Sequence, residues 1–148
     1  MNAAEQARGP LSPLWRLRAT GALLCFPPLL LLLPLDRITR WIERREPARL
    51  GGPVWDVALA EWVDRVLHRL PLPWRHTCLK RALVLQYLLR RAGRAAELCV
   101  GVRRGAGGEL LAHAWLVRDG RLYLEPGLEV VGDFQLLATF PDHSVPHS

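Results

Sequence analysis

Residues 77–93 read TCLKRALVLQYLLRRAG, and residues 96–102 read AELCVGV. In the first stretch apolar side chains recur at helical spacing, with Thr77 as a suitable N-cap residue and Gly93 as a C-terminal stop signal. The second stretch alternates with the period of a β-strand. The change of period at Gly93 predicts a largely buried helix over residues 78–92 that leads into a sheet.

Further strand signals follow. Residues 110–117 are strand-like, and Asp119-Gly120 is a tight hairpin signal before a third strand over residues 121–125. Residues 130–140 can supply one more short strand. The second half of the chain is therefore predicted to form an antiparallel sheet.

Helical patterns precede this core. Residues 14–19 and 35–45 can form helices, and residues 54–70 have an amphipathic pattern. The apolar stripe of the last helix is Val54, Val57, Ala58, Trp62, Val66 and Leu70, with Asp56, Glu61, Asp64 and Arg65 off it. The order of elements predicts an α+β fold, with residues 1–53 as a hydrophobic, helical arm and residues 54–148 as the main domain.

Composition restricts the class of protein. With 148 residues, half of them hydrophobic, the chain can bury one core but is too short for two ordinary domains. The net charge of +6 is not gathered into a basic block, which disfavours nucleic acid as a partner. Because neither GxxxxGK[ST] nor GxGxxG occurs, we expect no nucleotide site and no cofactor.

Cysteine and histidine usage gives a second restriction. The three cysteines are an odd number without a CxxC pair, which argues against a disulfide framework and a paired-thiolate zinc site. No HExxH motif is present among the five histidines. We therefore expect no metal site and a reducing, cytoplasmic location.

Residues 21–35, GALLCFPPLLLLLPL, are an uncharged run of fifteen. A spanning helix needs about 20 apolar residues, and Pro27, Pro28 and Pro34 are expected to break the helix three times. No small-residue cleavage site follows the run, as a signal peptide would require. A docked hydrophobic arm is the first interpretation, peripheral membrane contact the second and secretion the last.

Cys78 is the candidate nucleophile. A helix N-terminus carries unpaired N–H groups and a partial positive charge, which favour a thiolate and can supply an oxyanion donor. Cys25 lies in the apolar run and Cys99 in mid-strand, so both are interpreted as inert core residues. For Cys78 alone, a buried structural cysteine is at least as plausible as a nucleophile.

His113 lies in an apolar strand, where an imidazole needs a partner. A lone strand histidine is more often structural, but together with a cysteine at a helix start it becomes the candidate general base. The orienting acid should come from the strand across the hairpin. Counting about the turn pairs His113 with Pro126, so Glu125 is favoured if a bulge or register shift aims it. Asp119 is more simply a turn former.

The segments CLKRA (78–82), LLRRAG (88–93), VGV (100–102) and HAWL (113–116) resemble the transglutaminase-like maturation proteases of lasso-peptide biosynthesis, which process microcin-type precursors. The resemblance covers about residues 55–140. It implies a papain/transglutaminase-like core, with the nucleophile at the start of a helix packed on a small antiparallel sheet.

The resemblance also implies an activity and partners. It makes Cys78, His113 and Glu125 the triad, Glu125 standing twelve residues after the histidine where the family usually has Asp. Such a chain cleaves the leader from a precursor peptide, together with a leader-recognition protein and an ATP-dependent lasso cyclase. Two alternatives stay open: transfer of the acyl group to an amine, and a non-catalytic module that binds a peptide.

Overall fold

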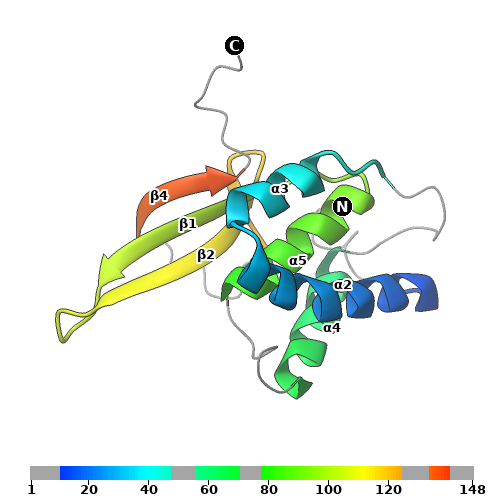
Figure 1. The fold of residues 1–148 in the computed structure, drawn as a ribbon, viewed down its shortest axis with the longest axis horizontal. Helices are drawn as coiled ribbons and strands as arrows, with labels where there is room; N and C mark the ends of the chain where they lie inside the picture. Colours follow the sequence, from blue (N-terminus) through cyan, green and yellow to red (C-terminus); the bar gives the residue numbers. More distant parts are fainter. Residues whose placement is uncertain (1–10, 48–55, 71–77, 125–133, 141–148) are drawn as a thin grey trace, which may run out of the picture.

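The computed structural model describes residues 11–47, 56–70, 78–124 and 134–140 (Figure 1). The helices are α2 (Pro13–Leu32), α3 (Leu35–Glu43), α4 (Asp56–Arg69) and α5 (Cys78–Arg91). The strands are β1 (Glu97–Arg104), β2 (Leu110–Arg118), β3 (Arg121–Tyr123) and β4 (Gln135–Phe140). The α+β fold predicted from the sequence is confirmed.

The sheet is antiparallel, with strand order β3-β2-β1-β4. Asp119 and Gly120 form the predicted hairpin turn between β2 and β3, with φ of 54° and 76°. Arg118 pairs with Arg121 across it. Two consecutive residues at positive φ match the right-handed twist of the flanking strands, which is why Asp-Gly signals this turn.

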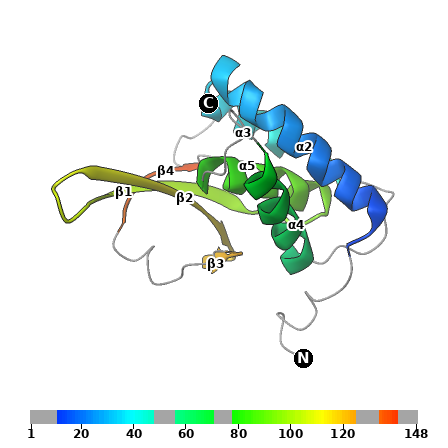
Figure 2. The same ribbon diagram turned by 90° about the horizontal axis from the view of Figure 1, so that it is seen from below.

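Helix α5 packs on one face of the sheet and is surrounded by the other three helices (Figures 1 and 2). One buried cluster joins helix residues such as Trp15, Val63 and Leu85 to Leu98 and Leu116 of the sheet. Side chains on both sides of residue 53 thus share a core. The expected boundary between arm and domain falls outside the described residues and stays a prediction.

The course of α2 differs from the sequence expectation. It runs without a break through Pro27 and Pro28 and ends at Leu32, with Leu33 as its C-cap. Each internal proline forgoes one helical hydrogen bond, but Pro27 is buried in the core, and packing offsets that loss. Among the described residues, no helix is both long enough and apolar enough to cross a bilayer.

The inward face of α4 was also placed wrongly. The buried residues are Asp56, Leu59, Ala60, Val63 and Leu67, whereas the described residues of the predicted stripe, from Val57 onward, are only partly buried. Asp56, expected at the surface, accepts hydrogen bonds from Arg94 at 2.9 Å and from the Tyr123 hydroxyl. The sequence alone does not show that partners from distant segments make this carboxylate compatible with burial.

Candidate active site

Cys78 is the first residue of α5, as predicted from the sequence. Its side chain is half-buried and packs at the margin of the main core. The predicted N-cap, Thr77, lies outside the described residues. The thiol therefore stands at the N-terminal, partially positive end of a fourteen-residue helix.

The other two cysteines behave differently from each other. Cys99 is buried, with its sulfur 3.9 Å from the Thr139 hydroxyl, and burial raises the pKa of its thiol. The expected burial of Cys99 in the core is confirmed. For Cys25 the same interpretation is wrong, because its side chain is exposed on the outer face of α2.

His113 lies on β2 opposite Gly101 of β1. Its ring centroid is 6.0 Å from that of Trp115 and 5.4 Å from that of Phe134. Ala114, the next residue, points to the other face and joins the helical core. The imidazole is therefore held by aromatic rings on the sheet face that α5 does not cover, at a half-buried position.

Gly101 makes room for this arrangement. A Cβ at residue 101 would lie 2.7 Å from Cη2 of Trp115 and 2.8 Å from the carbonyl oxygen of Gln135, both closer than real contacts allow. The β1–β4 register shifts by one residue at the same place. The glycine of VGV and the tryptophan of HAW thus form one steric unit beside His113.

Helix α5 contacts β2, the strand that carries His113, on the face of the sheet opposite to the imidazole. In the described part of the sheet, β3 pairs only with residues 116–118 of β2, so no strand covers the outer edge at residue 113. Helix α5 contacts β2, and its N-terminal end lies beside the middle of that strand in both views (Figures 1 and 2). The elements that carry Cys78 and His113 are thereby neighbours, whereas a bond between the two side chains stays a prediction.

Glu125, the predicted acid, lies outside the described residues. Strand β3 ends at Tyr123, and Leu124 has φ of 57°, so the chain leaves the ladder immediately before Glu125. Asp119 is exposed in the hairpin turn, the place expected of a turn former.

Sequence reasoning missed Arg81. Its Nη2 donates to the carbonyl oxygen of Leu124 at 2.8 Å, and its Nε donates to Asp64 at 2.7 Å. Arg81 is nearly buried and stands one helical turn after Cys78. It connects the start of α5 to the residue before Glu125. The available signal was a charged residue among the buried positions of an apolar helix.

A cleft of about 370 Å³ lies elsewhere, between α3, the C-terminal part of α5 and the turn after β2. Gln86 and Arg90 are among its lining residues, whereas Cys78 and His113 are not. Gln86 and Arg90 stand two and three helical turns after Cys78. The cleft therefore lies apart from the predicted active site.

A family model described as the transglutaminase-like superfamily matches residues 15–139. The match includes α2 and the four strands, and so extends over most of the described chain. Neither a curated protein nor a solved structure matches the chain significantly.

Proposed function

Since the chain belongs to the transglutaminase-like superfamily, we propose that it is a cysteine peptidase that removes the leader from a ribosomally made lasso-peptide precursor. Members of this superfamily are commonly cysteine proteases or acyl transferases. The proposed triad is Cys78 as nucleophile, His113 as base and Glu125 as the acid that orients it.

The connection through Arg81 is the observation that carries this proposal. Consecutive Cα atoms are about 3.8 Å apart, so fixing the Leu124 carbonyl also fixes where residue 125 begins. Arg81 thus holds the backbone before Glu125 within one side chain's reach of the helix that starts at Cys78. Burying a charged side chain such as Arg81 costs free energy, which is a reason to assign this contact a role beyond anchoring a loop.

The chemistry follows from these roles. The Cys78 thiolate attacks the carbonyl carbon at the end of the leader, and a C–S bond forms. As the C–N bond breaks, protonated His113 gives its proton to the departing amine of the core peptide. His113 then takes a proton from water, whose oxygen attacks the thioester and releases the leader as a carboxylic acid. Glu125 stabilises the imidazolium during both steps.

The substrate class rests on the joint motifs of residues 78–93, 100–102 and 113–116, which resemble the lasso-peptide proteases. The proposed partners are the precursor peptide, a leader-recognition protein and an ATP-dependent cyclase, and the proposed location is the cytoplasm. Acyl transfer to an amine is the second candidate, because the superfamily includes transferases and the same thioester serves both reactions.

Thiol reactivity tests the nucleophile. In the folded protein at neutral pH, iodoacetamide should alkylate Cys78 faster than the exposed Cys25, as followed by peptide mass spectrometry. His113→Ala should lower the Cys78 rate to that of Cys25. If Cys78 reacts no faster than Cys25 in the parent protein, the activated thiol is refuted and a peptide-binding module becomes the better description.

A cleavage assay tests the reaction. The full chain is incubated with a lasso-peptide precursor and its leader-recognition protein, and products are followed by mass spectrometry. Cys78→Ala should abolish cleavage, whereas Cys25→Ala is the matched control that should keep it. Cleavage that survives Cys78→Ala in a folded protein would overturn the assignment. Addition of an amine to the product would favour the transferase.

A further inference from the structure

The outer face of α2 is apolar and uncovered. The residues that form this α2 outer stripe are Leu14, Leu17, Gly21, Leu24, Cys25, Pro28, Leu31 and Leu32. They recur every three or four residues and so lie on one side of the helix. The exposed fraction is 70% for Leu17, 75% for Leu31 and 79% for Leu32. From residue 21 to its end α2 is apolar on all sides, and such a segment is normally buried on all sides, yet here one side faces outward.

We infer that the α2 outer stripe binds the surface of an anionic lipid membrane, with α2 lying parallel to it. This inference is independent of the peptidase proposal, because α2 contains none of the proposed triad. Contiguous exposed apolar patches of this kind mark protein or membrane contact sites.

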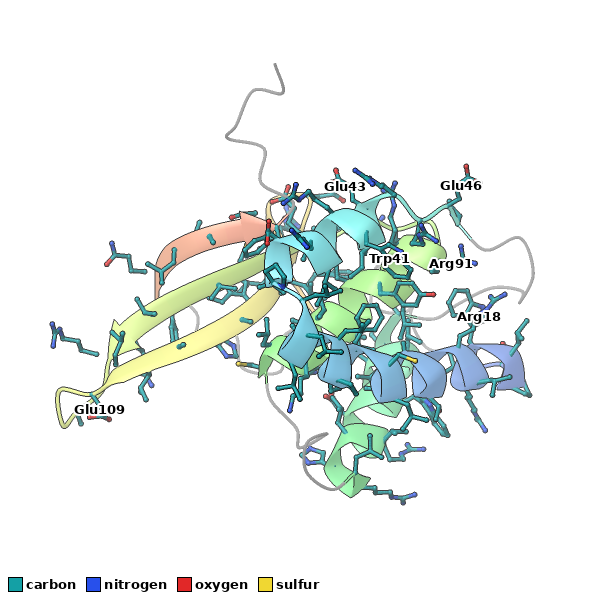
Figure 3. All side chains as sticks on the ribbon, in the orientation of Figure 1. Arg18, Trp41, Glu43, Glu46, Arg91 and Glu109 are labelled. Atoms are coloured by element: carbon teal, nitrogen blue, oxygen red, sulfur yellow. The ribbon has the colours of Figure 1, made fainter. Side chains whose placement is uncertain are left out.

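Charge favours lipid headgroups. Helix α2 contains no acidic residue, and Arg16 and Arg18 stand near its N-terminal end. In α3, Asp36 is neutralised by an ion pair with Arg40. The acidic side chains of Glu43 and Glu46 lie on the far side of α3 from α2 (Figure 3). Within α2 and α3, the described acidic side chains are therefore either paired or turned away from the stripe.

Composition favours a membrane over a protein partner. The aromatic side chains of α2, Trp15 and Phe26, point inward and are only 2% and 3% exposed. The stripe itself offers leucine, proline, glycine and one cysteine. Protein interfaces take most of their binding energy from Trp, Tyr and Arg, none of which lies on the stripe, whereas leucine is among the residues that interfacial membrane helices bury.

The shape of the molecule also fits a flat surface. A helix of twenty residues is about 30 Å long, and α2 crosses the front of the molecule in Figure 1 and forms its upper right border in Figure 2. Its whole stripe can therefore reach a plane at once. Such helices bury their apolar side about 5–10 Å into the headgroup boundary.

Sedimentation with vesicles tests the inference. The full chain should pellet with vesicles of equal parts phosphatidylcholine and phosphatidylglycerol, and less with phosphatidylcholine alone or at high salt. The variant Leu17→Ser/Leu24→Ser/Leu31→Ser should bind the anionic vesicles at least about tenfold more weakly. These three side chains are exposed, so the fold should survive, which circular dichroism checks.

The sheet offers a matched control. Leu110, Leu136 and Leu137 are 69%, 53% and 61% exposed, so replacing them with serine makes the same chemical change elsewhere. This control should bind like the parent. The inference is overturned if the parent chain does not pellet with anionic vesicles, or if the stripe variant binds them as strongly as the parent does. The inference is also overturned if the parent chain is a dimer, the stripe substitutions make it a monomer, and lipid has no effect. A second copy of the chain would then cover the stripe.

Discussion

Replacing Gly101 by alanine should destabilise the protein and disturb His113. The added Cβ would lie 2.7 Å from the Trp115 ring and 2.8 Å from a backbone oxygen of β4. The ring can move only at the expense of its packing on His113 and Phe134, and the backbone oxygen belongs to the sheet.

The magnitude follows from two opposing effects. Overpacking of this kind lowers the free energy of unfolding by about 1–3 kcal/mol. Alanine also restricts the unfolded chain more than glycine does, which raises the free energy of unfolding by about 0.4–1 kcal/mol. The net loss for Gly101→Ala should be about 1–2 kcal/mol, or roughly 3–8 °C in Tm for a chain of this length. Cleavage should fall further than the folded fraction does, since the rings beside His113 move.

Urea unfolding followed by tryptophan fluorescence measures the stability, and the cleavage assay measures the rate. Gly21→Ala is the matched control, because a Cβ there meets nothing within 4 Å and α2 should gain about 0.5–1 kcal/mol. Equal stability of Gly101→Ala and the parent would refute the steric reasoning. Trp115→Phe combined with Gly101→Ala should recover part of the loss, as coupled neighbours do.

Three further changes have defined outcomes. Arg81→Lys keeps the charge but cannot reproduce the two directed bonds to Asp64 and Leu124, so kcat should fall while secondary structure by circular dichroism stays. Burial raises the pKa of Asp56, so its contribution to stability is present below the usual Asp pKa of 3.8 and is lost as pH rises through the higher folded pKa. Urea unfolding at about pH 3 and pH 7 should therefore show the parent losing stability relative to Asp56→Asn, and a constant difference would contradict the buried charge. Pro28→Ala restores a helical N–H in α2 and should raise the free energy of unfolding by about 1–3 kcal/mol. If the stability does not rise, the packing of the proline ring stabilises the helix as much as the restored hydrogen bond does.

Local signals predicted the fold well where period and turn chemistry agree. The helix that begins at Cys78 and the turn at Asp119-Gly120 each follow from a few adjacent residues. The course of α2 through Pro27 and Pro28 did not, because tertiary packing there overrides a local rule. The buried face of α4 was not predictable either, because Asp56 is buried with hydrogen bonds from Arg94 and Tyr123, which are distant in sequence.

The site was predictable as residue types but not as geometry. A cysteine at a helix start and a strand histidine are visible in sequence, and the structure places their helix and strand side by side. Which face of the sheet His113 shares with Trp115 and Phe134 depends on sheet packing. The bond from Arg81 to Leu124 joins residues 43 positions apart, a distance over which no local pattern operates.

That same separation sets an order of assembly. Arg81 can bind Leu124 only after β1, β2 and β3 have been made and paired, because those strands lie between the two residues. Contacts of such sequence separation form late, since loop closure must come first. A refolding chain should therefore recover helical signal before rapid alkylation of Cys78 returns. The Cys78 thiol then becomes reactive only in a molecule whose sheet is complete. A newly synthesised chain that has not finished folding therefore carries no activated thiol.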